Sequence, residues 1–463
     1  MVKMSAFIDS HCHFLGMGYS STLIPLQDVK SMKELLDQLK KQPNQSIIIA
    51  RGWNQENLLE KRVPELSDLD QVSKEVPMVL IRTCGHVVVV NSKMLSIMNL
   101  NGKSLDSSSI PSKGYFVEED IHFVYDHIPK PTKEDLIHYL TIADEICLRN
   151  GITKVASDDF CIFDIPYEDV IEAILESQQS GKVHVSITEQ VNLPSIDTLK
   201  DFIKKGYPNK RYPKFKMGPL KLLADGSLGG RTAALHHPYS DDLTNRGILN
   251  FSDEELINLI RTADNAGMDS AIHAIGDRAV DQVLSAFIEV ISTSKRVAHN
   301  HAIIHAQIVD FRQISVMKEH HIGAIVQPIF LNSDLSMIQN RLGNRIFETY
   351  LFHSMKIMGI EVGFSTDSPV ENINPFENLF VSMTRTSLIH PNLDPHLVNE
   401  SFSIDEALYC YRTGNLRYIY ETEMNDFIIV DKHPNSVEVR QIPFIKVLQT
   451  IIDGQVVYNQ LDQ

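Results

Sequence analysis

The chain has 463 residues, with 43 basic and 59 acidic side chains and a formal net charge of −16. This length suits one large α/β barrel with an extra domain, and the acidic balance disfavours nucleic acid or anionic membranes as partners. No apolar run is long enough to span a membrane, no secretory core follows Met1, and the five cysteines form no CxxC pair, which favours a cytoplasmic protein.

The first expected element is a short apolar strand that begins at Phe7 and runs into Asp9-Ser10-His11-Cys12-His13. Because side chains alternate across a strand, His11 and His13 share a face, and Cys12 points to the opposite face, where we expect packing. Two neutral imidazoles on one face can hold a divalent metal. With 19 histidines, about one His-x-His pair is expected by chance. The second pair, His299 and His301, is treated as that accident.

Residues 1–22 are expected to form the first barrel strand and its loop, and residues 23–128 an inserted α+β domain. Within the insertion, the pattern predicts a helix from Met32 to Lys41 and strands at 46–50, 76–81 and 87–90.

Strands and helices alternate from residue 129 to about residue 410. Strands are predicted at 152–156, 183–187, 215–223, 268–273, 302–305, 322–327 and 361–365, with helices at 133–149, 167–180, 253–266, 279–292, 312–320 and 349–358. Such alternation predicts parallel β-structure, and eight units predict a TIM (β/α)8 barrel. Residues 411–463 are expected to be the remnant of a small C-terminal β-domain.

Several of the predicted barrel strands end in side chains that bind metals or titrate. These residues are His11, His13, Lys221, His273, His305 and Asp367. Active sites of TIM barrels lie at the carboxyl ends of the strands, so we expect these side chains to converge.

At these residues the chain resembles the amidohydrolase superfamily of metal-dependent hydrolases. It is most similar to the YtcJ-like branch, which includes N-substituted formamide deformylase. The segments that carry the resemblance are Ala50–Gln55, Cys84–His86, Asn91–Lys93, Ala224–Ser227, His273–Val280, His305–Gln307 and Asn374–Phe376.

The resemblance implies a ligand set for one or two divalent ions, with Zn²⁺ expected. His11 and His13 are similar to the ligands of one ion, and His273 and His305 to those of a second. Lys221 resembles a lysine that is carboxylated and bridges two ions; an uncarboxylated lysine, in a mononuclear site or a salt bridge, is the alternative. Its carbamate would supply an anionic oxygen ligand, which an ammonium cannot.

Asp367 resembles the aspartate that contacts the metal and carries the proton. His86 is expected to contact the substrate or the oxyanion, with a structural loop histidine as the alternative. Trp53 lines the pocket or packs in a core. Asp225, Ser227 and Arg231 are expected to shape the substrate pocket, unless the glycines beside them simply build a turn.

The expected function is therefore hydrolysis of an amide or formamide-type C–N bond of a small molecule by metal-activated water. Deamination, cyclic amide or ester hydrolysis on the same site, and a catalytically silent regulatory descendant, are the alternatives. Relatives usually begin with half of a small β-domain, whereas only about six residues precede the first strand here. We therefore expect the N-terminal half of this domain to be missing, and the reduced β-domain to have edges that a second subunit covers in a homodimer. Ile304 stands where relatives commonly carry Glu and is expected to affect packing.

Overall fold

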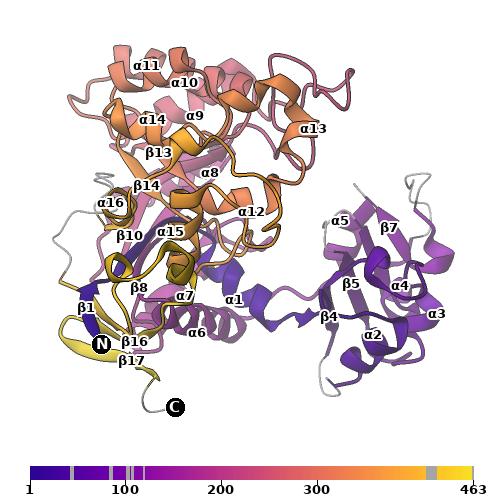
Figure 1. Cartoon of the computed structure of the whole chain (residues 1–463). Coiled ribbons are helices and arrows are strands. Elements are labelled where there is room, and N and C mark those ends of the chain that lie inside the picture. Colours follow the sequence, from indigo (N-terminus) through magenta and orange to yellow (C-terminus); the bar gives the residue numbers. More distant parts are fainter. Residues whose placement is uncertain are drawn as a thin grey trace. The chain divides into compact units, whose positions relative to one another are not determined.

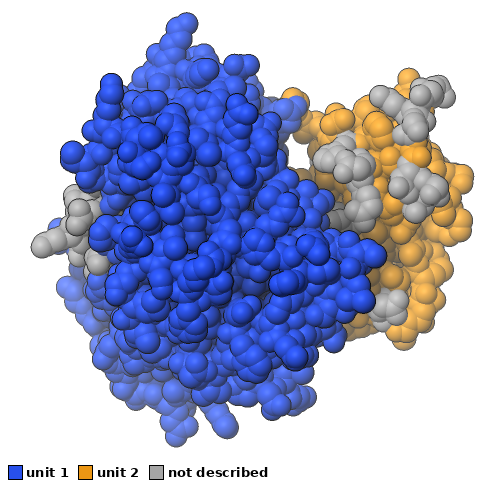
Figure 2. Space-filling view, turned by 90° about the horizontal axis from the view of Figure 1, so that it is seen from above, with its two compact units in different colours: residues 1–18, 132–463 blue, residues 19–131 orange. Residues whose placement is uncertain are grey.

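A computed structural model describes residues 1–41, 46–82, 87–100, 105, 109–117, 120–412 and 425–460. The chain divides into two compact units, one of residues 1–18 and 132–463 and the other of residues 19–131 (Figure 2). The boundary falls within helix α1 (Phe14–Thr22), so the inserted unit starts four residues before the expected position and ends three residues after it.

The larger unit contains the expected barrel of eight parallel strands (Figure 1). Its strands are β2 (Phe7–Cys12), β8 (Ile152–Ser157), β9 (Ser186–Asn192), β10 (Phe215–Leu223), β11 (Ser270–Ala274), β12 (Ala302–His305), β13 (Gly323–Val326) and β14 (Val362–Phe364). After α1, the helices between and after them are α6 (Lys133–Arg149), α7 (Tyr167–Gln179), α8 (Ile196–Lys204), α9 (Asp253–Asn265), α10 (Asp277–Thr293), α11 (Phe311–Glu319), α12 (Leu331–Asp334), α13 (Ile338–Leu342), α14 (Phe352–Ile357), α15 (Pro375–Thr384) and α16 (Ile404–Arg412).

The first and last strands of the barrel, β2 and β14, meet through backbone hydrogen bonds just beyond their ends. The Asp367 N–H donates to the His11 carbonyl at 2.9 Å, and the His13 N–H donates to the Ser368 carbonyl at 2.8 Å. Asp9 adds a buried side-chain link, because its carboxylate accepts from the Thr366 hydroxyl at 2.6 Å. The seam of the barrel is therefore held at the residues that carry the predicted ligands.

The barrel interior holds a small apolar cluster separate from the main core. Its six residues come from five strands of the sheet and so touch across the lumen: Ile8, Ala156, Ala271, Ala302, Ile304 and Ile325. Ile304 thus has the packing role expected of it. The larger core lies where the outer faces of the strands pack against the helices.

One predicted barrel strand, at 183–187, forms later than expected, as β9. Asp144 in α6 accepts the backbone N–H groups of His184 and Val185 at 2.8 and 2.9 Å, so these two groups are not free to join a ladder. The strand instead continues through Glu189 and Gln190, whose polar side chains hid it from the hydrophobic pattern.

The chain's N-terminus contributes more to the small β-domain than the sequence suggested. Residues Val2–Ser5 form β1, which pairs antiparallel with β15 (Phe427–Val430), and β16 (Val447–Ile452) and β17 (Gln455–Asn459) complete a four-stranded sheet. In Figure 1 the indigo β1 lies among the yellow strands of the other end of the chain. The expectation that the N-terminal half is missing is corrected to a reduced half of one strand.

The inserted unit has a five-stranded mixed sheet of β3 (Ile24–Pro25), β4 (Ile48–Trp53), β5 (Met78–Arg82), β6 (Val87–Val90) and β7 (Tyr115–Val117), with helices α2 (Met32–Leu39), α3 (Leu66–Leu69), α4 (Ser92–Met98) and α5 (Ile121–Tyr125). Successive residues of its strands enter two different apolar clusters, which is the alternation expected of a sheet covered on both faces. None of the described helices of either unit has the length and apolarity needed to cross a membrane.

Candidate metal centre at the barrel mouth

Three of the predicted ligands meet directly at the carboxyl ends of β2 and β14. Asp367 Oδ1 lies 3.2 Å from His11 Nε2 and 3.1 Å from His13 Nε2. His305, at the end of β12, joins them: ligand atoms of His11, His305 and Asp367 lie within 4.8 Å of one another. All three of these residues are buried.

The opposite ring nitrogens of the three histidines are each held by an oxygen. His11 Nδ1 lies 2.5 Å from Gln190 Oε1, His13 Nδ1 lies 2.8 Å from the Asp158 carbonyl, and His305 Nδ1 lies 2.7 Å from Gln327 Oε1. Oxygen acceptors at Nδ1 favour the proton on that atom, which leaves the Nε2 lone pair directed at Asp367.

His273, at the end of β11, presents its other nitrogen. Its Nε2 lies 3.0 Å from the Gly226 carbonyl, so the proton belongs on Nε2 and Nδ1 keeps the lone pair. Its ring packs edge-on against His305, with 4.4 Å between centroids. The four imidazoles thus supply three Nε2 donors and one Nδ1 donor at one end of the barrel.

Lys221 reaches the same region from β10. Its ammonium is 2% exposed and lies 3.2 Å from Asp158 Oδ2. Burial is the main reason that the pKa values of His11 and of His305 are lowered, and the charge of Lys221 adds to this effect. The structure therefore brings all six predicted strand-end residues to one end of the barrel, where the Lys221 ammonium is paired with Asp158.

The electrostatics of the cluster depend on the carboxylate at its centre. Burial acts to raise the pKa of Asp367, but the contacts with His11 and His13 outweigh it and hold that pKa well below its ordinary value. Burial alone acts to lower the pKa of His13, and the contact with Asp367 raises it to about 9. Burial lowers the pKa of His305 well below its ordinary value. The group favours an anionic Asp367 with positive charge beside it.

The hydrogen bonding of the Asp367 carboxylate shows that these residues fit a divalent cation. Asp367 Oδ1 is buried and receives no hydrogen bond from any described residue, although two imidazole nitrogens lie beside it. The Nε2 atoms of His11 and His13 face the same carboxylate oxygen, and a shared cation there would take the place of the proton that stabilises the contact between His13 and Asp367. The donor set, imidazole nitrogens with carboxylate oxygen, is the one that Zn²⁺ takes at open catalytic sites.

Two residues of the cluster have backbone conformations that non-glycine residues rarely adopt. The φ angle is +75° at His305 and +57° at Asp367. Each such residue costs on the order of 1–3 kcal/mol and persists only where surrounding structure holds it, which is typical of functional sites. This feature has no signal in the sequence.

Four residues that support the cluster were missed in the sequence: Asp9, Asp158, Gln190 and Gln327. Asp158 follows the predicted strand 152–156 by two residues, and Gln327 ends the predicted strand 322–327, so the same strand-end argument would have found both. Gln190 was hidden because its strand was placed too early.

Asp225, one of the predicted substrate-pocket residues, holds backbone segments together. Asp225 is buried, and its carboxylate accepts three backbone N–H groups, from Ala234, Ile275 and Gly276, at 2.8–3.0 Å. It also lies 3.3 Å from His273 Nε2, so its contacts are those of a residue that positions loops and a ligand.

Arg231 and Ser227 lie on the loop after β10. The Arg231 guanidinium is paired with Asp241, and exposed Ser227 accepts a hydrogen bond from the Gly230 N–H at 3.1 Å. Trp53 is fully buried in the core of the inserted unit, where its indole N–H donates to the Leu80 carbonyl, as in the core-packing alternative. His86 lies outside the described residues.

His299 and His301 form a second cluster with Asp264. Both histidines precede β12, so they lie at its amino end, whereas the candidate centre lies at the carboxyl ends of the strands. The Ser270 N–H donates to His301 Nδ1 at 3.0 Å, which places the ring proton on Nε2, and Arg296 is paired with Asp264. A protonated nitrogen has no lone pair for a metal, so this cluster keeps its bystander interpretation.

Comparisons with known proteins agree with the geometry. The pattern of the Amidohydrolase family matches residues 2–458. Putative amidohydrolase YtcJ of Bacillus subtilis is 28% identical, over 99% of this chain and 89% of its own. N-substituted formamide deformylase of Arthrobacter pascens is 19% identical, over 98% of this chain and 88% of its own.

A solved structure is also similar over most of its length. An uncharacterized metal-dependent hydrolase from Pyrococcus horikoshii OT3 has 29% sequence identity and a TM-score of 0.82, over 95% of this chain and 87% of its own. With the family pattern matched along almost the whole sequence, this chain belongs to the Amidohydrolase family.

Proposed function

We propose that the protein is a metal-dependent hydrolase that cleaves an amide or formamide-type C–N bond of a small molecule with water as the nucleophile. The observation that carries this proposal is the convergence of His11 Nε2 and His13 Nε2 on one buried Asp367 oxygen, with a ligand atom of His305 within 4.8 Å of those of His11 and Asp367. Buried polar atoms in folded proteins normally have a hydrogen-bond partner, and the buried Asp367 Oδ1 receives no hydrogen bond from the described residues. This arrangement is therefore better explained by ligand binding than by a role in holding the fold.

His11, His13 and Asp367 would hold one ion, and His305 with His273 Nδ1 a second. A Zn²⁺ ion held there lowers the pKa of water to about 7 and polarises a carbonyl oxygen. Lys221 would bridge two ions if CO2 carboxylated it, and it would leave Asp158 in that case. An intact-protein mass increased by one CO2, lost in Lys221→Met, would support the carbamate.

The protein's own residues then handle the proton. Asp367 is anionic and buried, so it can accept a proton from the attacking water and deliver it to the leaving nitrogen. Gln190, Gln327 and the Asp158 carbonyl keep the imidazoles in one tautomer throughout. The C–N bond is preferred because a relative matched along nearly its whole length is named for formamide cleavage.

A pair of histidine variants tests the site. His13→Ala should lose bound metal and lower kcat/KM by more than about 100-fold on a panel of amides, formamides and esters, because it removes a ligand. His236→Ala, at an exposed histidine paired with Asp281, should change neither. Elemental analysis and initial rates are the measurements. Unchanged metal content and activity in His13→Ala would reject the site, and the panel separates amide from ester and deaminase chemistry.

A further inference from the structure

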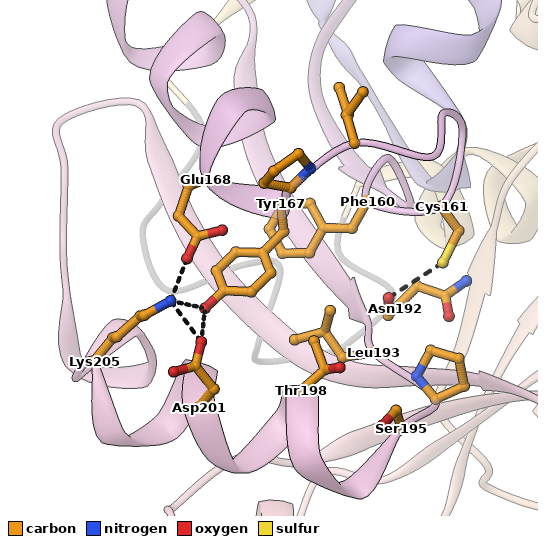
Figure 3. Close-up of a pocket in the computed structure, with 13 residues that line it drawn as sticks. Phe160, Cys161, Tyr167, Glu168, Asn192, Leu193, Ser195, Thr198, Asp201 and Lys205 are labelled. Carbon is orange, nitrogen blue, oxygen red and sulfur yellow. Dashed lines mark hydrogen bonds and ion pairs between the residues drawn. The ribbon is translucent and has the colours of Figure 1, made fainter. Parts of the chain in front are cut away.

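A cavity of about 300 Å³ lies in the larger unit, beside the carboxyl ends of β8 and β9. Residues of the loop after β8, the loop after β9 and helix α8 line it (Figure 3). This is the end of the barrel that carries the candidate metal centre, because His11, His305 and Asp367 also follow the carboxyl ends of their strands.

The cavity and the metal centre share a wall. Asn192 lines the cavity, and its amide donates to Asp158 Oδ2 at 3.1 Å. The same oxygen lies 3.2 Å from Lys221 Nζ, and the Asp158 carbonyl accepts from His13. Phe160, which also lines the cavity, is two residues from Asp158, so the backbone distance between them is at most about 7 Å. Asn192 therefore contacts both the cavity and the carboxylate that holds Lys221, which places the cavity next to the candidate centre.

The walls are mainly apolar. Phe160, Tyr167 and Leu193 are each at most 6% exposed, and the rings of Phe160 and Tyr167 pack with 5.7 Å between centroids. The Cys161 thiol donates to the Asn192 carbonyl at 3.3 Å. Such walls suit an aromatic ring or a branched alkyl group.

The charged residues at the rim of the cavity leave no free hydrogen-bond donor on Lys205 for an anion. Lys205 Nζ contacts Glu168 at 2.6 Å, Asp201 at 2.5 Å and the Tyr167 hydroxyl at 3.3 Å, which occupies all three of its donors (Figure 3). One cation with two carboxylates leaves a net charge of −1. A carboxylate on the ligand would therefore meet repulsion without a free donor to offset it.

We propose that this cavity is the subsite for the side group of the amide substrate, and that this group is an aryl or branched alkyl group without a carboxylate. The inference rests on the proposed hydrolase function and adds the substrate class.

Two tryptophan variants on one helix test the subsite. Thr198 lines the cavity from α8, so Thr198→Trp should fill it, whereas Lys200 is exposed on the same helix and does not line it. For the metal-loaded full chain, kcat/KM on N-benzylformamide should exceed that on N-methylformamide and on N-(4-carboxybenzyl)formamide. Thr198→Trp should lower the benzyl value at least about 10-fold and leave the methyl value unchanged. Lys200→Trp should change neither.

The outcomes separate the two proposals. If Thr198→Trp keeps full activity on N-benzylformamide, or if the carboxybenzyl compound is the better substrate, the subsite is wrong while the hydrolase function stands. If wild type hydrolyses none of the three compounds, the proposed function fails. Calorimetric binding of N-benzylformamide to both proteins then decides the subsite: tighter binding to wild type supports it, and equal or absent binding overturns it.

Discussion

At the scale of single residues, the cluster is defined by which nitrogen of each histidine is free. An imidazole that donates from Nδ1 to a fixed oxygen has a predetermined Nε2 lone pair, and His11, His13 and His305 all meet this condition. Residue type and position along the strand predict that a histidine can be a ligand. The tautomer depends on a partner far away in the sequence, such as Gln190 for His11.

Asp367→Asn tests the proton role of the carboxylate. The amide retains the shape of the side chain but cannot accept a proton from water, so kcat should fall by about 100-fold or more, with a smaller effect on KM. Steady-state kinetics with metal content measured on the same samples would check this.

Glu371→Gln is the control for that variant. Glu371 is the next carboxylate along the same loop, where it accepts from Ser333, and its loss should lower kcat less than about tenfold. A fully active, metal-loaded Asp367→Asn variant would remove Asp367 from the mechanism.

At the scale of elements, the loop after β10 depends on one buried carboxylate and on one close approach. Asp225 accepts from three backbone N–H groups that belong to two different loops. A Cβ on Gly276 would lie 2.0 Å from the Ala234 carbonyl, so only glycine allows these loops to meet. Asp225 and Gly276 therefore hold the loop after β10 against the end of β11, where His273 lies.

Asp225→Ala should lower the free energy of unfolding by roughly 2–4 kcal/mol, because it leaves three buried N–H groups without an acceptor. Denaturant unfolding in the presence of a chelator measures this without a contribution from bound metal. Asp242→Ala, at a half-buried aspartate of the same loop whose carboxylate accepts from Thr244, should change stability by less than about 1 kcal/mol. Equal effects of the two variants would contradict the role of Asp225.

At the scale of the whole molecule, stability should depend on pH through the buried carboxyl group of Asp334. Burial raises the pKa of Asp334 to about 6, although Tyr350 and Gln307 donate to it and act to lower it. The folded state therefore retains a proton that the unfolded state releases between about pH 4 and about pH 6. The free energy of unfolding should fall as pH rises through this window, and this contribution is constant above it.

Asp334→Asn should remove this dependence. Its stability relative to wild type should improve by about 3 kcal/mol between about pH 4 and about pH 7, since the variant has no proton to release. Unfolding curves at the two pH values measure the difference, with the half-buried Asp242→Asn variant as control. If the difference in the free energy of unfolding between variant and wild type is the same at both pH values, Asp334 has the same pKa in the folded and unfolded states, which would contradict this prediction.

The fold was largely readable because a barrel of this kind is repetitive. Apolar strands of four to nine residues and amphipathic helices recur along the chain, and the strands 215–223 and 302–305 were placed to the residue. The exceptions have local causes: polar Glu189 and Gln190 hid a strand, and β1 was too short to distinguish from a leading tail.

By itself, the sequence determined the barrel and the identity of six strand-end side chains, since both follow from periodicity and from the rule that parallel strands end together. Only the tertiary structure decided which lone pairs face the cluster, that Asp158 joins Lys221 to it, and that His305 and Asp367 take left-handed backbone. Each of these depends on atoms distant in the sequence, and hydrogen-bond geometry and strain exist only once the chain has closed around them.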